Sequence, residues 1–275
     1  MNARHRTTGL VAAIAAAITL AAPSAAVGAQ PNVARAATAA EEVGWLRLGH
    51  FSPDTAEVDV RLTALSGGTV VFELSDVGYG DLSPYQSLGE GTYTVNMNPA
   101  GSDDWSTVAI SDTVTVRPSA ASTVAAYGPT ATLQLKAFDD DLTAPSAGNA
   151  RIRLIQLSTV TPTVDVATST GVSIAEDALA GSATAYTEVP AGSWTMTLTG
   201  EGVTGSATVD LESGSVYTLF VLDTADGGLT ILPIHDSAAA AVVPIGGVDT
   251  GGGWLSGTQV AVRHPAPAPR GWAAF

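Results

Sequence analysis

An internal repeat sets the architecture of this chain. The segment LRLGHFSPDTAEVDV (46–60) aligns without a gap with IRLIQLSTVTPTVDV (152–166). Both segments contain Arg-Leu, then a Ser at a matched position, and both end in Val-Asp-Val. A chain of 275 residues can hold one large domain or two ordinary ones. The repeat decides for two copies of one domain.

The similarity continues downstream of these segments. Tyr85 corresponds to Tyr186, and Gly91-Thr92-Tyr93 corresponds to Gly192-Ser193-Trp194. The second copy is shorter, and we expect the missing residues mainly between its second strand and Tyr186, because loops accept deletions that cores do not. We expect the first copy at 43–141, a linker at 142–149 and the second copy at 150–236.

Both copies have the sequence pattern of short strands. In 91–98, Tyr93, Val95 and Met97 alternate with polar residues, which is typical of a half-buried strand. Further strands are expected at 45–51, 58–60, 69–74, 113–116, 122–127 and 131–138, and no segment shows a sustained helical stripe. About seven short strands per copy predict an all-β fold of two tandem antiparallel β-sandwich domains, immunoglobulin- or transthyretin-like.

The charge balance limits the partners of such a protein. The chain has 11 basic and 26 acidic residues, a net charge of -15, and Lys136 is its single lysine. Such a surface repels nucleic-acid phosphates and anionic lipid head groups, and it favours cationic partners or loosely held divalent ions. The chain has no cysteine, which removes thiol catalysis, Fe–S clusters and Cys-based zinc sites.

The two ends of the sequence differ from its body. Residues 1–29 have the pattern of a secretory signal peptide, with Arg4 and Arg6 before an apolar run and small residues before Gln30. An uncleaved membrane anchor is the alternative, but the run at 10–22 is shorter than the about 20 residues that a spanning helix needs. Residues 30–42 are expected to be a flexible lead-in, and 237–275 a Gly/Ala/Pro-rich tail.

Each copy carries an Asp within Val-Asp-Val, Asp59 in the first and Asp165 in the second. Its valine neighbours point to one face of the strand, so the Asp points to the other. One interpretation is a solvated strand residue. The other is a buried carboxylate that bonds to the backbone of a turn, which would explain its presence in both copies.

The segment from Leu48 to Val60, with His50-Phe51-Ser52-Pro53-Asp54 before Val-Asp-Val, resembles the opening of the DUF4397 family. Tyr186 with Pro190-Ala191-Gly192 and Trp194 resembles a downstream element of that family. The resemblance covers about 43–236. It implies secreted or cell-envelope bacterial proteins, often in tandem, with an uncharacterised role. The second copy has Gln156, Thr159 and Val160 in place of His50, Pro53 and Asp54, so a function that needs them belongs to the first copy. The Ala-rich, Lys-poor composition resembles that of actinobacteria.

His50, Ser52 and Asp54 are the residue types of a hydrolase triad, but triads assemble from distant segments and these three share one strand end. The chain also has no Gly-x-Ser-x-Gly motif. Ser52-Pro53-Asp54 is typical of a turn, because Pro fixes φ and Asp bonds back to the backbone. His50 and Asp54 remain candidate binding residues.

Asp139, Asp140 and Asp141 close the first copy, and together with Asp54 they are candidate ligands for Ca²⁺, which binds several oxygens. A solvated acidic strand end is the alternative. The second copy keeps Asp236 at this place, beside His235. No other cofactor is expected.

Aromatic side chains offer one more candidate. Tyr93 and Trp194 occupy matched positions and are expected in the cores. Trp105 has no counterpart in the second copy, so we expect it to be an exposed contact residue.

Together these observations predict a secreted or cell-envelope protein without catalytic activity, which binds a cell-wall or envelope component or a protein partner. A secreted hydrolase with its site in the first copy and a Ca²⁺-stabilised adhesion module are the alternatives. We expect no nucleic-acid partner and no membrane span in the mature chain.

Overall fold

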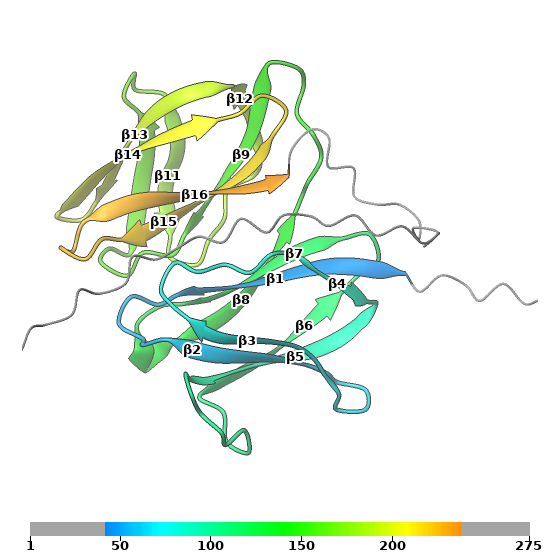
Figure 1. Ribbon diagram of the computed structural model, residues 1–275. Coiled ribbons are helices and arrows are strands. Elements are labelled where there is room, and N and C mark those ends of the chain that lie inside the picture. The colour runs from blue at the N-terminus through cyan, green and yellow to red at the C-terminus, as the bar shows by residue number, and fades with distance from the viewer. Residues whose placement is uncertain (1–41, 238–275) are drawn as a thin grey trace, which may run out of the picture. The chain divides into compact units, whose positions relative to one another are not determined.

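A computed structural model describes residues 42–237, and strands make up most of this range (Figure 1). The expected signal peptide (1–29), lead-in (30–42) and tail (237–275) lie outside the described residues, apart from residues 42 and 237 at their borders. No helix within 42–237 is long and apolar enough to cross a membrane.

The first copy consists of two four-stranded sheets, ordered β4-β1-β7-β8 and β3-β2-β5-β6. Its strands are β1 (Val43–Phe51), β2 (Val58–Ala64), β3 (Val70–Val77), β4 (Gln86–Gly89), β5 (Gly91–Pro99), β6 (Ile110–Val116), β7 (Ala121–Tyr127) and β8 (Gln134–Asp140), with a 3-10 turn η1 at Thr130–Thr132 before β8.

The second copy repeats this order strand for strand, as β12-β9-β15-β16 and β11-β10-β13-β14. Its strands are β9 (Asn149–Gln156), β10 (Thr163–Thr168), β11 (Ser173–Leu179), β12 (Thr187–Pro190), β13 (Gly192–Gly200), β14 (Val203–Leu211), β15 (Val216–Asp223) and β16 (Leu229–Ser237). The predicted all-β fold of two tandem sandwiches is confirmed. Residues 141–148 connect β8 to β9.

The sequence pattern predicted antiparallel sheets, but the sheets also contain parallel pairs of strands. β1 pairs in parallel with β7, and β9 pairs in parallel with β15. These strands are nearly continuous runs of buried residues, as expected for strands with both faces covered. Strand alternation alone cannot distinguish the two pairings.

Each copy has its own apolar core between its two sheets. The alternation predicted in 91–98 is confirmed, because Tyr93, Val95 and Met97 are buried in the first core. Trp194, at the position of Tyr93, is half-buried against the second core. Each of the two aromatic side chains bonds to a backbone carbonyl four residues earlier, Tyr93 to Gly89 and Trp194 to Pro190.

The Asp of Val-Asp-Val holds a bulge in the neighbouring strand. The Asp59 carboxylate accepts the N–H of Asp76 at 3.0 Å, and that of Asp165 accepts the N–H of Asp177 at 2.7 Å. Asp76 and Asp177 have φ of 55° and 46°, a left-handed conformation that costs about 1 kcal/mol or more for a residue with a side chain. The carboxylates are therefore neither buried nor merely solvated, because they stabilise a strained bulge in both copies.

The two sandwiches close differently along one side. In the second copy, Gly205 of β14 pairs with Leu229 of β16, which joins both sheets into one of eight strands. A Cβ atom on Gly205 would lie 2.0 Å from the carbonyl oxygen of Leu229, so only glycine permits this approach. In the first copy, Ile110 pairs with Met97 as Gly205 pairs with Leu198. Ile110 therefore occupies the matched position, and the two sheets stay separate there.

A third apolar cluster contains residues of both copies. The ring of Phe51 stacks on that of Phe220, with centroids 4.6 Å apart. Tyr127 and Phe138 of the first copy and Ile155 and Leu157 of the second belong to the same cluster, as do Ala125 and Leu222. β7 and β15 each contribute side chains to the core of their own copy and to this third cluster, which explains their continuous burial.

Candidate functional site

The open side of the first copy forms a cleft of about 460 Å³. Its walls come from the connection after β1, the ends of β2, β5 and β6, and the connection that contains η1. The volume lies within the range of small-molecule and peptide-anchor sites, about 300–1,000 Å³. The lining residues are Asp54, Thr55, Ala56, Glu57, Val58, Met97, Asn98, Pro99, Ala109, Ile110, Thr130, Ala131, Thr132 and Leu133.

A long connection between β5 and β6 reaches this cleft through its last residue, Ala109. It spans 100–109, whereas the matching turn of the second copy is only 201–202. The buried side chain of Asn98 holds it, because its amide donates to the carbonyl of Asp104 at 2.9 Å and its oxygen accepts the N–H of Ala109 at 2.9 Å. The expectation that the second copy loses residues mainly before Tyr186 was therefore incomplete, since this connection is shortened as well.

Asp54 lines the cleft and ties two connections together. Its carboxylate accepts the N–H of Thr130 at 2.8 Å and lies 3.3 Å from the Ser52 hydroxyl oxygen. The bond from Thr130 lowers the pKa of Asp54. The second copy makes a similar tie in the reverse direction, because Asp223 at the end of β15 accepts the N–H of Thr159. Asp54 thus has a structural role and also faces the cleft.

His50 does not reach the cleft surface. Its side chain is 1% exposed and lines a cavity of only about 10 Å³ inside the first core, together with Leu48, Val60 and Met97. Both of its ring nitrogens lack a hydrogen-bond partner among the described residues. Burial lowers the pKa of His50, so the imidazole is neutral at neutral pH.

The residues of the considered hydrolase triad are not assembled for catalysis. The buried Ser52 hydroxyl donates to the carbonyl of Gly128 at 2.6 Å. Neither nitrogen of His50 accepts a bond from Ser52, although a serine nucleophile needs a base within hydrogen-bond reach. The geometry agrees with the turn that the sequence predicts at 52–54.

Trp105 lies in the long connection beside the cleft and is half-buried. The guanidinium carbon of Arg61 lies 4.1 Å from the centroid of its indole ring. Arg61 also pairs with Glu73 on β3. The structure therefore shows Trp105 in a cation–π contact, and its role as a contact residue for a partner stays a prediction.

Asp139, Asp140 and Asp141 do not converge on one point. Asp139 and Asp140 face opposite sides of β8, and Asp141 follows the end of the strand. Each carboxylate pairs with a different arginine: Arg117, Arg153 and Arg151, respectively. Within 42–237, no group of three or more His, Asp or Glu is placed to hold a metal ion. The arrangement gives no support to the Ca²⁺ site considered at these residues.

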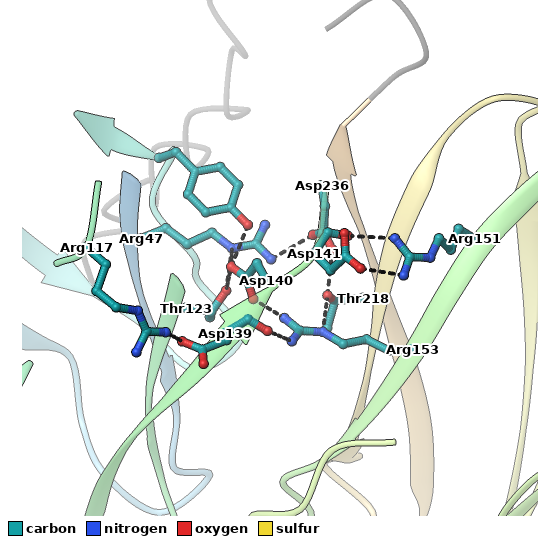
Figure 2. A network of polar contacts seen from close by, with 11 residues as sticks. Arg47, Arg117, Thr123, Asp139, Asp140, Asp141, Arg151, Arg153, Thr218 and Asp236 are labelled. Carbon is teal, nitrogen blue, oxygen red and sulfur yellow. Dashed lines mark hydrogen bonds and ion pairs between the residues drawn. The ribbon is translucent and has the colours of Figure 1, made fainter. Parts of the chain in front are cut away.

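Asp140 instead belongs to a reciprocal polar network between the copies, which Figure 2 shows. Arg47 of the first copy donates to Asp236 of the second at 2.6 Å, and Arg153 of the second donates to Asp140 of the first. Threonines at matched positions complete both halves: Thr123 accepts from Arg47, and Thr218 accepts from Arg153. Each copy thus supplies the carboxylate that the other copy's arginine needs.

The network is almost fully withdrawn from water. The side chains of Arg47 and Arg153 are 3% exposed, and those of Asp140 and Asp236 are 0% exposed. Burial raises the pKa of Asp236, and the positive charge of Arg47 opposes this effect. The Tyr85 hydroxyl donates to Asp140 at 2.6 Å, and burial raises the pKa of Tyr85 well above its ordinary value.

Sequence reasoning missed this network, although the repeat contained its signal. Arg47 and Arg153 are a matched pair, and Asp140 and Asp236 are another. An arginine in the middle of an apolar strand suggests a buried ion pair when both copies keep it. The pairing across copies was not deducible, because alignment shows equivalence and not contact.

These features define a tandem β-sandwich protein with a loop-lined cleft in its first copy. The buried ion pairs Arg47–Asp236 and Arg153–Asp140 form a charged seam between the copies. The family described as "Domain of unknown function (DUF4397)" matches residues 44–167 and 168–243. The chain belongs to this family, and the resemblance drawn from the Ser-Pro-Asp and Val-Asp-Val motifs is confirmed. The two matched segments meet at the end of β10 and not in the connection between the copies.

No curated protein matches the chain. Among solved structures, it is similar to the TIE protein of Bacillus anthracis, with 10% identity, a TM-score of 0.23 and coverage of 66% of this chain and 34% of that one. The chain therefore spans about a third of that protein's length.

Two further structures have comparable scores. A family CBM26 module from Eubacterium rectale Amy13K, solved with maltoheptaose, shows 13% identity, a TM-score of 0.24 and coverage of 68% and 96%. The tip fimbrial protein Mfa3 of Porphyromonas gingivalis shows 8% identity, a TM-score of 0.22 and coverage of 70% of this chain and 99% of that one. Scores this low support no argument about function.

Proposed function

We propose that this protein is an exported, non-enzymatic binding module that holds its ligand in the cleft of the first copy. The observation that supports this proposal is the contrast at one matched position. Gly205 closes the second sandwich by direct backbone pairing, whereas Ile110 stands at the corresponding place in the first and lines an open cleft. One copy is thus closed where the other can accept a partner.

The lining of the cleft suits binding. Val58 and Met97 form a buried apolar floor, and Ile110 and Leu133 are half-buried apolar walls. Covering such surface stabilises a complex by roughly 25 cal/mol per Å² before the costs of association. The hydroxyls of Thr55, Thr130 and Thr132 add hydrogen-bonding groups that can orient a ligand.

The support for a non-enzymatic role comes from the same region. Asp54 already accepts the N–H of Thr130, and the Ser52 hydroxyl is committed to a carbonyl. Export follows from the signal-like pattern of 1–29, and a cell-wall or envelope component or an extracellular protein is the partner that we propose.

Retention of the purified full-length protein on cell-wall polysaccharide and envelope fractions tests the proposal. Ala131→Trp places a large ring in the cleft at an exposed position, and Ala225→Trp is the matched control in the β15–β16 turn of the second copy. We expect Ala131→Trp to lose retention at least tenfold and Ala225→Trp to keep it. Equal retention of both variants, or no retention of the wild type on any fraction, contradicts the proposal.

A further inference from the structure

The positive charges of the described chain are used within the protein. Five arginines each pair with a carboxylate: Arg47 with Asp236, Arg61 with Glu73, Arg117 with Asp139, Arg151 with Asp141 and Arg153 with Asp140. The ammonium of Lys136 donates to the carbonyl of Gly181 at 2.6 Å. Among the arginines and the lysine of residues 42–237, Lys136 alone therefore has no carboxylate partner.

Negative charge, in contrast, remains at the cleft. Asp54 and Glu57 belong to its lining, which contains no basic residue. Glu57 is exposed. A cleft with apolar walls and charge of one sign concentrates ions of the opposite sign. The ligand that fits this charge carries a cation.

The backbone around the cleft indicates the form of the ligand. β6 and β8 are the outer strands of their two sheets. In the second copy, the corresponding edges meet through the pairing of Gly205 with Leu229. In the first copy, the matched residue Ile110 begins β6, whose outer edge is hydrogen-bonded to no other strand of the described range. A free strand edge is a template for an extended peptide.

Resting on the proposed function of the cleft, we infer that its ligand is an extended segment of a partner polypeptide that presents a lysine side chain. The main chain of the segment lies along the edge of β6. The lysine methylenes pack on Ile110 and Leu133, and the ammonium lies near Glu57 and Asp54. Lysine commonly buries its methylene stem on apolar surface and keeps its ammonium at a polar edge. This arrangement matches the apolar walls and the two carboxylates that line the cleft.

Fluorescence anisotropy with the full-length protein tests this inference. The probe is a labelled pentapeptide, Val-Thr-Lys-Val-Thr, with acetylated and amidated ends. The first comparison peptide carries acetyl-lysine, which removes the charge. The second carries N-methyl groups on alternate residues, which prevents strand pairing. We expect the unmodified peptide to bind and each modified peptide to bind at least about tenfold more weakly.

Protein variants locate the site. Glu57→Gln removes one exposed charge at the cleft, and we expect a two- to fivefold loss, roughly what an exposed ion pair contributes. Glu176→Gln removes an exposed charge on β11 and is the matched control. Ala131→Trp should abolish binding, and Ala225→Trp should not.

Three results overturn the inference: no binding of the lysine peptide, equal binding of the acetyl-lysine or N-methyl peptide, and equal losses in Glu57→Gln and Glu176→Gln. If the peptide fails while envelope retention still depends on residue 131, the ligand class is wrong and the proposed function stands. If both fail, the cleft is not a binding site.

Discussion

Removal of the Arg47 guanidinium should destabilise the folded chain far more than removal of the Arg117 guanidinium. Each arginine makes an ion pair of 2.6 Å with an aspartate. They differ in burial, because the Arg47 and Asp236 side chains are 3% and 0% exposed, whereas Arg117 and Asp139 are 58% and 76% exposed. The two ion pairs thus have the same distance and differ in burial, and Arg47 additionally donates to Thr123.

The magnitude follows from what each variant leaves behind. In Arg47→Met, the buried carboxylate of Asp236 keeps, among residues 42–237, only the Thr218 hydroxyl, which donates at 2.6 Å. An uncompensated buried charge costs about 3–5 kcal/mol. In Arg117→Met, water solvates Asp139, and an exposed pair contributes about 0–1 kcal/mol. We expect a difference of about 3 kcal/mol between the two variants.

Urea unfolding followed by tryptophan fluorescence measures both free energies. The double variant Arg47→Met with Asp236→Leu is the internal control, because removal of both charges leaves no unpaired carboxylate. It should be more stable than Arg47→Met alone. The reasoning fails if Arg47→Met and Arg117→Met lose equal stability, or if the double variant recovers none of the loss.

Two further predictions concern the closed side of the second copy and acid. Gly205→Val should lower the free energy of unfolding by about 1–3 kcal/mol, because the valine side chain meets the backbone of Leu229. Urea unfolding measures this loss. The control Ser206→Val, on the exposed side of the same strand, should change the free energy of unfolding by less than about 0.5 kcal/mol. Burial raises the pKa of Asp236 in the folded state above its unfolded value of about 3.9. As the pH falls from above the folded pKa to about 3.9, the folded state takes up the proton first, so the wild type should gain stability relative to Asp236→Asn. The Arg151 bond holds the pKa of Asp141 far below its usual range, so the wild type should lose stability relative to Asp141→Asn below about pH 3.9. Unfolding curves from pH 7 to 2.5 give both signs, and changes in the same direction contradict the assignment.

Much of the fold was predictable because its signals are local. Alternation in β5, Pro and Gly between strands, and the repeat itself gave the two sandwiches. β4 was missed, since its sequence Gln-Ser-Leu-Gly carries no alternation over its four residues. The parallel pairing of β1 with β7 could not be predicted from the sequence either, because it joins segments far apart in the chain.

The candidate site was predictable only in part. The sequence directed attention to residues special to the first copy, and Asp54 does line the cleft there. Ile110 was overlooked, because its significance comes from alignment with Gly205, and that alignment requires the strand registers. The run Asp139–Asp141 looked like one acidic group, but strand geometry distributes its members among three arginines.

The crossed pairing of arginines and aspartates also bears on how the two halves stay together. They are joined by a covalent connection of residues 141–148, and short tethers keep two partners at an effective concentration in the millimolar range. An interface that binds with micromolar affinity between separate molecules would therefore be closed nearly all of the time within one chain. The tether permits the seam to contain buried charges, whose desolvation would weaken a dimer of free domains.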